Sequence, residues 1–345
     1  MLLFVCILKT MKKIKSILYF FSFFSISLII NAVVCKVSTA EQATIYVTTT
    51  TGMLADATKQ IFKGYANVTS IMGVGVDPHL YQPTRSDIAL LYNASLIIAN
   101  GLLLEGRMTE ALTRISNASS RQNFKSPRII FAGSLIDKSK LLTPEGIASS
   151  GHYDPHIWMD PVLWSEVVEN LTIEIVRLYP SYAKEIRENS AEYQKKLSSL
   201  DQYAKKALSS IPKTSKILIT AHDAFHYFAR RYGLEVRSLQ GISTESEASV
   251  RDIEGLVKES VNRNVKAVFV ESTISQRNIN ALIEGASKLN HPLKIGGNLY
   301  SDAMGPPGTY EGTYLGMLDH NITTISRSLG GEAPKKGWQG LISVE

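Results

Sequence analysis

The sequence contains seven histidines, and three of them stand where metal ligands are expected. His79 and His156 each end an Asp-Pro-His tripeptide, and His222 follows a strand expected at Lys216–Thr220. In open α/β sheets, ligands bind in the loops beyond the carboxyl ends of the strands. Neutral imidazole is the commonest side-chain ligand for divalent transition ions. The pattern therefore predicts a divalent metal site that includes these three imidazoles.

A carboxylate should complete this ligand set, and the sequence offers three candidates. Asp302 follows an expected strand and lies in a loop with a glycine and two prolines. Glu271 ends the strand expected at Val265–Val270, and Asp223 is adjacent to His222. We favour Asp302, but the spacing alone leaves Glu271 open.

The other four histidines are interpreted as structural residues. His226 lies four residues after His222, which is the spacing of a metal-binding helix, but no glutamate is adjacent to the first histidine. His320 lies in the middle of an expected helix, and His152 and His291 lie in expected loops. Of these, His152 is the candidate for a transient metal contact at the rim of the site.

Strands that alternate with helices predict an α/β fold with two βα lobes and parallel sheets. We expect an N-terminal lobe at residues 41–180 and a C-terminal lobe at 211–345, with the metal site in the cleft between them. The expected strands are Thr44–Thr50, Asn67–Gly73, Ser95–Asn100, Arg128–Ala132, Lys216–Thr220, Val265–Val270 and Leu293–Ile295. The expected helices are Gly52–Gly64, Thr84–Tyr92, Glu105–Ser116, Trp164–Tyr179, Ala224–Tyr232, Val250–Arg263, Gln276–Leu289 and Thr309–Leu329.

One segment differs from the rest of the alternating pattern. Residues 181–210 contain neither glycine nor proline and are rich in Ala, Glu, Lys, Gln and Leu, which favour helix. A single helix of this length would extend roughly 45 Å and could join the two lobes as a rigid rod. The alternative is two helices with a kink between them.

Residues 1–40 are expected to be a secretory signal. Three lysines at positions 12, 13 and 15 precede an apolar run at Ile17–Val34, and small residues favour cleavage after Ala40. Met11 is an alternative start, and an uncleaved anchor is the alternative to cleavage. We therefore expect the protein outside the cytoplasm, in the periplasm or at the cell surface.

Both cysteines, Cys6 and Cys35, lie in this segment, so residues 41–345 contain no cysteine for a disulfide, a thiolate nucleophile or a thiolate metal site. Cys35 is a candidate for lipid attachment, although Val34 is larger than the residue that usually precedes a lipidated cysteine. Five of the 37 basic residues lie within residues 1–40, which contain no acid. The remaining 32 basic residues against 31 acidic ones give no electrostatic case for binding nucleic acid.

Several long stretches resemble the solute-binding proteins of bacterial ABC importers for zinc and manganese, the TroA-like group. The resemblance covers nearly all of residues 43–331, in stretches at Gly75–Thr84, Asp154–Pro161, Thr220–Tyr232, Leu239–Ser249, Val268–Ser272 and Leu299–Gly316. It implies two βα lobes joined by one long helix, and the ligands His79, His156, His222 and Asp302. It also implies a cargo of Zn²⁺ or Mn²⁺ that is passed to a membrane permease and its ATPase. We expect a monomer.

The same resemblance informs the choice of metal. Manganese-preferring relatives often have Glu at the position of His222, and zinc-dedicated relatives often carry a loop rich in histidine and acids between the first two ligands. In this sequence, the segment Leu80–Tyr153 between the first two ligands contains a single histidine, His152. The set resembles members that accept both metals, and zinc should bind more tightly in an unstrained site. An Fe²⁺ carrier is the second candidate within this class.

The alternative class is a secreted zinc hydrolase. A catalytic zinc keeps an open position for water beside a general base, for which Glu271 or Asp223 would serve. Four protein ligands and the lack of an activated nucleophile argue against an enzyme. We therefore expect no catalytic activity and no catalytic cofactor.

Overall fold

The computed structural model describes residues 44–120, 127–143 and 152–343. The expected signal at residues 1–40, with Met11, Cys35 and the cleavage site after Ala40, lies outside the described residues. Among the described residues, no helix combines the length and hydropathy that a membrane crossing requires.

The first lobe contains one parallel sheet of four strands in the order β2-β1-β3-β4. The central strand β3 is buried along its whole length, as its sequence LIIA predicts. The strands are β1 (Ile45–Thr49), β2 (Ala66–Ser70), β3 (Leu96–Ala99) and β4 (Arg128–Phe131). The helices are α2 (Gly52–Phe62), α3 (Arg85–Asn93), α4 (Thr109–Ser120) and α5 (Pro161–Leu178).

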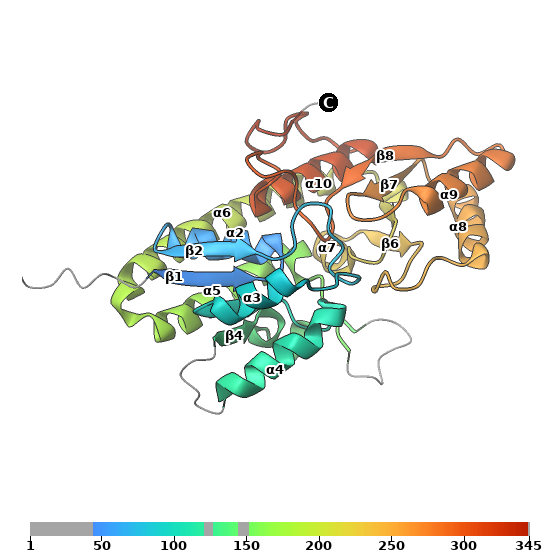
Figure 1. The fold of residues 1–345 in the computed structure, drawn as a ribbon. Coiled ribbons are helices and arrows are strands. Elements are labelled where there is room, and N and C mark those ends of the chain that lie inside the picture. The colour runs from blue at the N-terminus through green and yellow to red at the C-terminus, as the bar shows by residue number, and fades with distance from the viewer. Residues whose placement is uncertain (1–43, 121–126, 144–151, 344–345) are drawn as a thin grey trace, which may run out of the picture. The chain divides into compact units, whose positions relative to one another are not determined.

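The second lobe repeats this arrangement with two parallel ladders, β5-β6 and β7-β8. Because β5 lies beside β7, the spatial order is β6-β5-β7-β8, which matches the order in the first lobe. Strands β6, β7 and β8 are labelled in Figure 1. The strands are β5 (Ile217–Thr220), β6 (Glu235–Ser238), β7 (Ala267–Glu271) and β8 (Lys294–Leu299). The helices are α7 (His226–Tyr232), α8 (Val250–Asn262), α9 (Arg277–Lys288) and α10 (Tyr314–Ser328).

Helix α6 (Ala183–Ser209) is continuous over 27 residues, or about 40 Å, so the kinked alternative is wrong. Its first half belongs to the first lobe, where Asn189 donates to a carbonyl of α2 and Ser190 bonds to α5. Its second half belongs to the second lobe, where the Tyr203 hydroxyl and the Ala207 carbonyl both bond to α10. The helix therefore joins the lobes as one rigid element (Figure 1).

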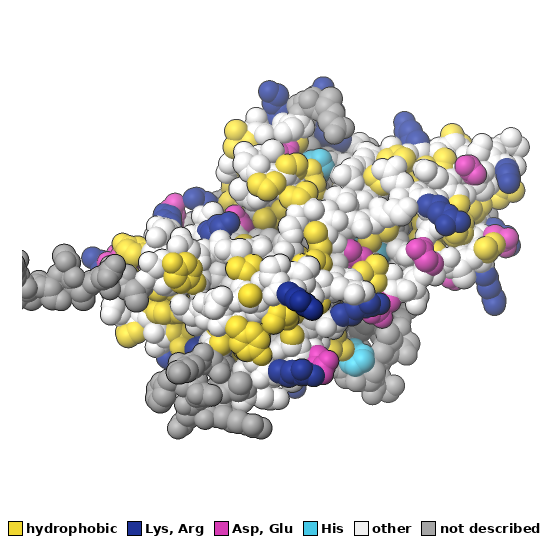
Figure 2. Space-filling model, viewed as in Figure 1, with side chains coloured by type: hydrophobic (Ala, Val, Ile, Leu, Met, Phe, Trp, Pro, Cys, Tyr) yellow, Lys and Arg dark blue, Asp and Glu magenta, His cyan; other side chains and the backbone are white. Residues whose placement is uncertain are grey.

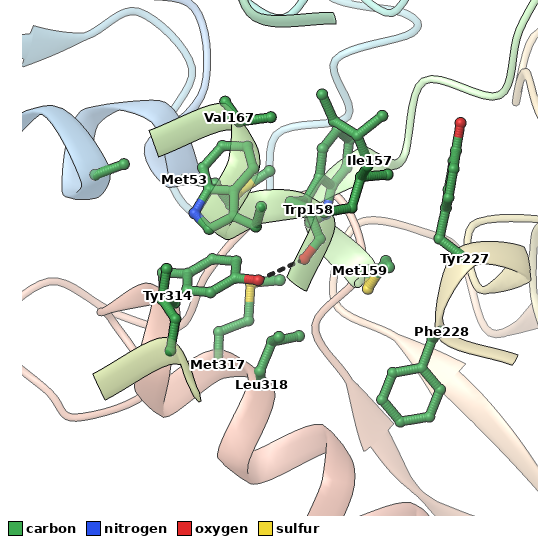
Figure 3. Close-up of a cluster of buried hydrophobic side chains, with 14 of the residues drawn as sticks. Met53, Ile157, Trp158, Met159, Val167, Tyr227, Phe228, Tyr314, Met317 and Leu318 are labelled. Atoms are coloured by element: carbon green, nitrogen blue, oxygen red, sulfur yellow. Dashed lines mark hydrogen bonds between the residues drawn. The ribbon is translucent and has the colours of Figure 1, made fainter. Parts of the chain in front are cut away.

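One hydrophobic core runs through both lobes rather than stopping at the boundary between them. Trp164 of α5 stacks on Tyr314 of α10, with ring centroids 5.3 Å apart. The Tyr314 hydroxyl donates to the carbonyl of Trp158 at 2.8 Å (Figure 3). Because buried aromatic pairs contribute packing and directional contacts, this shared core limits how far the lobes can separate.

Two strands differ from the sequence prediction. Strand β6 was not predicted, because its four residues, Glu, Val, Arg and Ser, include only one apolar side chain and give no clear pattern. Strand β8 extends to Leu299, well beyond the expected Leu293–Ile295. The prediction ended at Ile295 because Gly296 and Gly297 interrupt the apolar pattern. A Cβ at Gly297 would lie 2.4 Å from Thr324 of α10, so these glycines allow the helix to pack closely on the strand.

Helices α4 and α10 begin four and five residues later than predicted, and local turns explain the difference. Helix α10 begins at Tyr314 rather than Thr309, because the Thr313 side chain caps it by accepting from the Gly316 amide. Helix α4 begins at Thr109, after a short 3₁₀ turn that follows Glu105.

On the face shown in Figure 2, basic and acidic side chains are interspersed, and the basic and acidic residues of 41–345 are nearly equal in number.

Candidate metal centre

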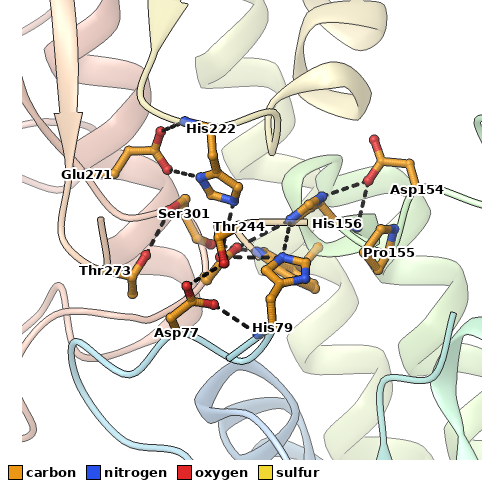
Figure 4. Close-up of polar contacts among 12 residues, drawn as sticks. Asp77, His79, Asp154, Pro155, His156, His222, Thr244, Glu271, Thr273 and Ser301 are labelled. Carbon is orange, nitrogen blue, oxygen red and sulfur yellow. Dashed lines mark hydrogen bonds and ion pairs between the residues drawn. The ribbon is translucent and has the colours of Figure 1, made fainter. Parts of the chain in front are cut away.

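Four buried side chains converge where loops of the two lobes meet: Asp302 and the three histidines His79, His156 and His222, which are labelled in Figure 4. One possible ligand atom from each lies within 4.8 Å of the others. His79 lies in the loop after β2, His222 directly after β5, and Asp302 after β8. His156 immediately precedes the 3₁₀ turn η5 (Ile157–Met159). The structure thus brings together all four of the ligands that the sequence predicts.

Four contact distances within this cluster lie close to the edge length of a metal coordination tetrahedron. The Nε2 atoms of His79 and His156 are 3.3 Å apart, and His222 Nε2 is 3.1 Å from Asp302 Oδ2. Asp302 Oδ1 is 3.4 Å from His156 Nε2, and Asp302 Oδ2 is 3.7 Å from His79 Nε2. A tetrahedron with Zn–N and Zn–O bonds of 2.0–2.1 Å has edges of roughly 3.3 Å. These spacings therefore suit an ion of the size of zinc.

Several of these atoms are buried without a hydrogen-bond partner among the described residues. They are His222 Nε2 and both carboxylate oxygens of Asp302. Burying such atoms unsatisfied costs free energy, so native proteins rarely leave them unpaired. A bound cation would satisfy all three at once, which favours a metal site over a purely structural cluster.

The two Asp-Pro-His tripeptides form the same local turn. In each, the aspartate Oδ1 accepts from the backbone amide of the histidine two residues later, at 2.8 Å for Asp77–His79 and 2.9 Å for Asp154–His156. Asp154 Oδ1 also bonds to His156 Nδ1 at 2.7 Å. This contact fixes the ring so that Nε2 faces the centre, as in metal sites where a carboxylate orients the ligating imidazole.

Glu271 orients His222 rather than competing with Asp302 for the centre. Its Oε1 accepts from the His222 amide at 2.8 Å, and its Oε2 bonds to His222 Nδ1 at 2.6 Å (Figure 4). Both carboxylate oxygens are thus engaged on the side of His222 that faces away from the cluster. Glu271, left open as a ligand by its spacing, takes the position of an outer partner.

Asp302 is held in place by contacts to the two residues before it. The Trp158 indole donates to the Ser301 carbonyl at 2.8 Å, and the Trp158 ring packs edge-on against His156. The Asn321 side chain bonds both backbone groups of Tyr300, at 2.9 and 2.7 Å. The loop that carries Asp302 is therefore fixed to both lobes.

The surroundings shift the pKa values of the cluster in opposite directions. Burial lowers the pKa of His79 to about 3, so this imidazole is neutral. Burial alone would lower the pKa of His222, but the carboxylates of Glu271 and Asp302 outweigh it and raise that pKa well above its usual value. Burial alone would raise the pKa of Asp302, but the surrounding imidazoles, His222 first, outweigh it and lower that pKa. Without metal, a protonated His222 and an ionised Asp302 therefore attract each other, although their contact at 3.1 Å is not a hydrogen bond of good geometry.

The remaining histidines lie outside this cluster. Helix α7 begins at His226, so His226 and His222 do not share a helix face, and His226 Nε2 bonds to Asp223 at 2.8 Å instead. His320 donates to the Asn298 carbonyl, and His291 contacts a backbone carbonyl in its own lobe. His152 is exposed.

Sequence reasoning missed the supporting roles of Asp77, Asp154, Trp158 and Asn321. A signal for the first two was present, because a repeated Asp-Pro-His tripeptide is typical of a turn closed by its own aspartate. Trp158 and Asn321 act on residues distant in the sequence, so no local pattern indicated them.

Comparison with known proteins gives a consistent result. The family model described as ZnuA, zinc-uptake complex component A, periplasmic, matches residues 47–328. The manganese-binding lipoprotein MntA of Bacillus subtilis is 42% identical over 283 residues, covering 82% of this chain and 89% of that protein. The zinc-binding protein TroA of Treponema pallidum is 41% identical over 283 residues, covering 82% and 88%.

Solved structures are also similar to this chain over most of its length. The periplasmic zinc-binding protein TroA from Treponema pallidum superposes with a TM-score of 0.78, covering 83% of this chain and 99% of that one. Fe(III)-bound YtgA from Chlamydia trachomatis is 27% identical with a TM-score of 0.70, covering 84% and 99%. The predicted α/β fold and the resemblance to the TroA-like group are confirmed. On this evidence, the chain belongs to the ZnuA family of metal-binding proteins.

Proposed function

We propose that this chain is the extracytoplasmic binding protein of a metal importer. It captures Zn²⁺ or Mn²⁺ between its lobes and delivers the ion to an ABC permease and its ATPase. The observation that carries the proposal is the convergence of three imidazole nitrogens and one carboxylate in a buried cluster. Relatives named for manganese binding and zinc binding support it.

The donor set accounts for a choice between two metals. Three imidazoles and one carboxylate suit tetrahedral Zn²⁺. Both oxygens of Asp302 lie within 3.7 Å of a cluster nitrogen, so the carboxylate can also bind through both oxygens and raise the coordination number for Mn²⁺. We propose that the site accepts both ions and binds zinc more tightly. The Fe(III)-bound relative makes iron the next candidate to test.

We also propose how the chain is divided and where it acts. Residues 41–180 and 211–345 form the lobes, 181–210 link them, and 1–40 direct export. Relatives named as lipoproteins support a location outside the cytoplasm. In such a protein, Cys35 would be the site of lipid attachment, and the binding protein would act as a monomer.

A hydrolase is disfavoured by the same geometry. A catalytic zinc needs an open water position and a free general base. Four protein side chains converge here, both oxygens of Glu271 are bonded to His222, and Asp223 is bonded to His226. Neither acid that could act as a base is available to a metal-bound water.

Metal titration of the purified protein tests the binding step. We expect one Zn²⁺ or Mn²⁺ per chain by native mass spectrometry. His222→Ala and Asp302→Ala should weaken zinc binding by more than the about 10–100-fold that is typical of outer partners. His320→Ala is the matched control and should bind like the unaltered protein. Native zinc affinity in His222→Ala would disprove the ligand assignment and turn attention to Glu271 or His226.

Reconstitution tests the delivery step. The cognate permease and ATPase would be placed in proteoliposomes with ATP and radioactive zinc. Zinc should accumulate inside only when the metal-loaded binding protein is added outside. Equal accumulation without the binding protein would overturn the importer assignment.

A further inference from the structure

The stretch Leu239–Ser249 matches the family pattern but contributes no metal ligand. It forms the loop between β6 and α8 in the second lobe. Two side chains, Gln240 and Asn278, donate to the same oxygen of Glu247, at 3.2 and 3.1 Å. Glu247 thus ties the loop to the end of β6 and to the start of α9, which gives the loop a defined conformation.

This conformation places Thr244 against the first lobe. The Thr244 hydroxyl donates to Asp77 Oδ2 at 2.6 Å, and Asp77 Oδ1 accepts from the backbone amide of His79 at 2.8 Å (Figure 4). Thr244 is only 6% exposed. A hydrogen bond from a buried hydroxyl to a carboxylate is stronger than one between neutral groups.

The two Asp-Pro-His turns differ in what the aspartate bonds besides the backbone amide of its histidine. Asp154 bonds both the amide and the ring of its own histidine, so both hydrogen bonds that orient His156 come from within its tripeptide. Asp77 bonds the amide of His79 with one oxygen and uses the other for Thr244. The support of His79 therefore depends on a residue from the opposite lobe.

We infer that Thr244 is a positioning residue that holds His79 in the metal site from across the lobe boundary. This inference rests on the proposed function, because it assumes that His79 binds the transported ion. With the Thr244–Asp77 bond in place, the loop that carries His79 is held against the second lobe. Without it, Asp77 Oδ2 loses its donor and the loop is freer to turn away, which opens a route for the ion to leave.

Two substitutions separate the hydroxyl from the shape of the side chain. Thr244→Val keeps the branched shape but removes the donor, whereas Thr244→Ser keeps the donor. Zinc dissociation into a strong chelator would be followed by stopped flow. We expect zinc to dissociate from Thr244→Val at least about ten times faster than from the unaltered protein, because outer-shell partners typically contribute 10–100-fold to metal affinity. Thr244→Ser should stay within about twofold of the unaltered protein, since it retains the bond.

A control variant and a spectroscopic readout exclude a general loss of stability. Thr172→Val removes a hydroxyl that is equally buried, at 6% exposed, and that bonds Val168 and Ser190 far from the site. It should lower the thermal stability without changing zinc release. The visible absorption of Co²⁺-loaded Thr244→Val should differ from that of the unaltered protein, because the position of His79 changes, whereas the Thr172→Val spectrum should not.

The outcomes distinguish this inference from the proposed function. If the unaltered protein bound no zinc, the proposed function itself would fail. If the unaltered protein and Thr244→Ser bound zinc tightly and Thr244→Val released it at the same rate with the same Co²⁺ spectrum, the role of Thr244 would be disproved. Faster release from Thr172→Val to the same degree would show a general stability effect and would also overturn the inference.

Discussion

Two of the three histidines at the centre have their Nδ1 atoms fixed by buried carboxylates. Asp154 holds His156, and Glu271 holds His222. Each carboxylate selects the ring nitrogen that faces the metal and makes that nitrogen a better donor. The imidazoles of His156 and His222 are therefore oriented before an ion arrives, so metal binding loses less free energy to ordering these side chains.

Glu271→Gln should weaken zinc binding by about 10–100-fold, the usual effect of losing an outer carboxylate partner. The amide is uncharged, so it supports the His222 ring less strongly. Competition against a chelator of known affinity measures the change. Asp223→Asn is the matched control, because Asp223 is adjacent to His222 in sequence but bonds His226. Equal losses in the two variants would show that charge near the site, rather than the Glu271 contact, is responsible.

Metal binding should release about one proton near neutral pH, because only a neutral imidazole binds a metal. The pKa of His222 is raised well above its usual value, so this group is protonated in the metal-free site, while His79 with a pKa of about 3 is already neutral. The apparent zinc affinity should therefore rise with pH up to the raised pKa of His222. Calorimetry in buffers of different ionisation enthalpy counts the protons. Absence of net release at pH 7 would contradict the protonated state of His222.

Local sequence features indicated three of the four proposed donors, whereas Asp302 was the favoured one of three carboxylate candidates and most of the supporting residues could not be predicted. Strand-end positions and the repeated Asp-Pro-His tripeptide are local features, so His79, His156 and His222 were visible. Thr244 contacts Asp77 across 167 positions, and Trp158 contacts Ser301 across 143. Such pairs are set by how the lobes pack, which no local pattern indicates.

At the scale of elements, the loop after β3 supports the first two histidines. Glu105 is buried and accepts from the amides of Asn100 at 2.6 Å and Gly101 at 3.0 Å. The Asn100 side chain donates to the carbonyl of Pro155, directly before His156. Between these contacts, Leu102 and Leu103 adopt left-handed conformations, with φ of 55° and 66°. Strained residues of this kind persist only where the surrounding contacts hold them, and they are typical of ligand-binding loops.

Gly106→Ala should weaken zinc binding about tenfold or more, the scale of other outer-shell changes. Gly106 has a positive φ of 33°, and a Cβ there would lie 2.5 Å from the His79 carbonyl oxygen, so the loop carrying His79 must shift. Gly64→Ala is the control, because Gly64 has a positive φ of 97° with no atom within 4 Å of an added Cβ. Both variants should lose stability, but only Gly106→Ala should lose affinity in a chelator competition. Unchanged affinity in Gly106→Ala would show that this contact does not position His79.

The elements themselves were largely predictable where their patterns were long. The absence of glycine and proline predicted α6, and the helix expected at Thr84–Tyr92 is α3, which begins with a capping box formed by Thr84 and Asp87. The short strand β6 and the glycine-containing part of β8 were missed, because their identity depends on neighbouring strands and on α10. Contacts with the rest of the fold, rather than local sequence preference, decide whether such segments form strands.

At the scale of the whole molecule, α6 and the shared core restrict the motion of the lobes. The helix is bonded to α2 and α5 at one end and to α10 at the other. A continuous helix bends sharply only at features such as proline, a Gly/Ser pair or a bulge. We therefore expect metal release to involve loops around the site and modest tilting, rather than the wide hinge closure of other binding proteins.

Spin labels on both lobes would test this restriction. Tyr92→Cys in the first lobe and Leu289→Cys in the second replace exposed residues, and residues 41–345 contain no other cysteine. The distance distribution from electron resonance should be narrow and should shift little when zinc is added. Tyr46→Cys with Tyr92→Cys, both in the first lobe, is the control pair. A large shortening between the lobes on zinc binding, with no change in the control pair, would show a true hinge.

X-ray absorption spectroscopy of the zinc-loaded protein tests the central claim most directly, because it counts the atoms around the ion. We expect three imidazole nitrogens and one or two carboxylate oxygens from Asp302, at about 2.0–2.2 Å, with no sulfur. His222→Ala loaded with zinc should lose one imidazole from this count. A shell with fewer than three imidazoles, or one made mostly of water oxygens, would contradict the assignment of His79, His156, His222 and Asp302 as the metal site.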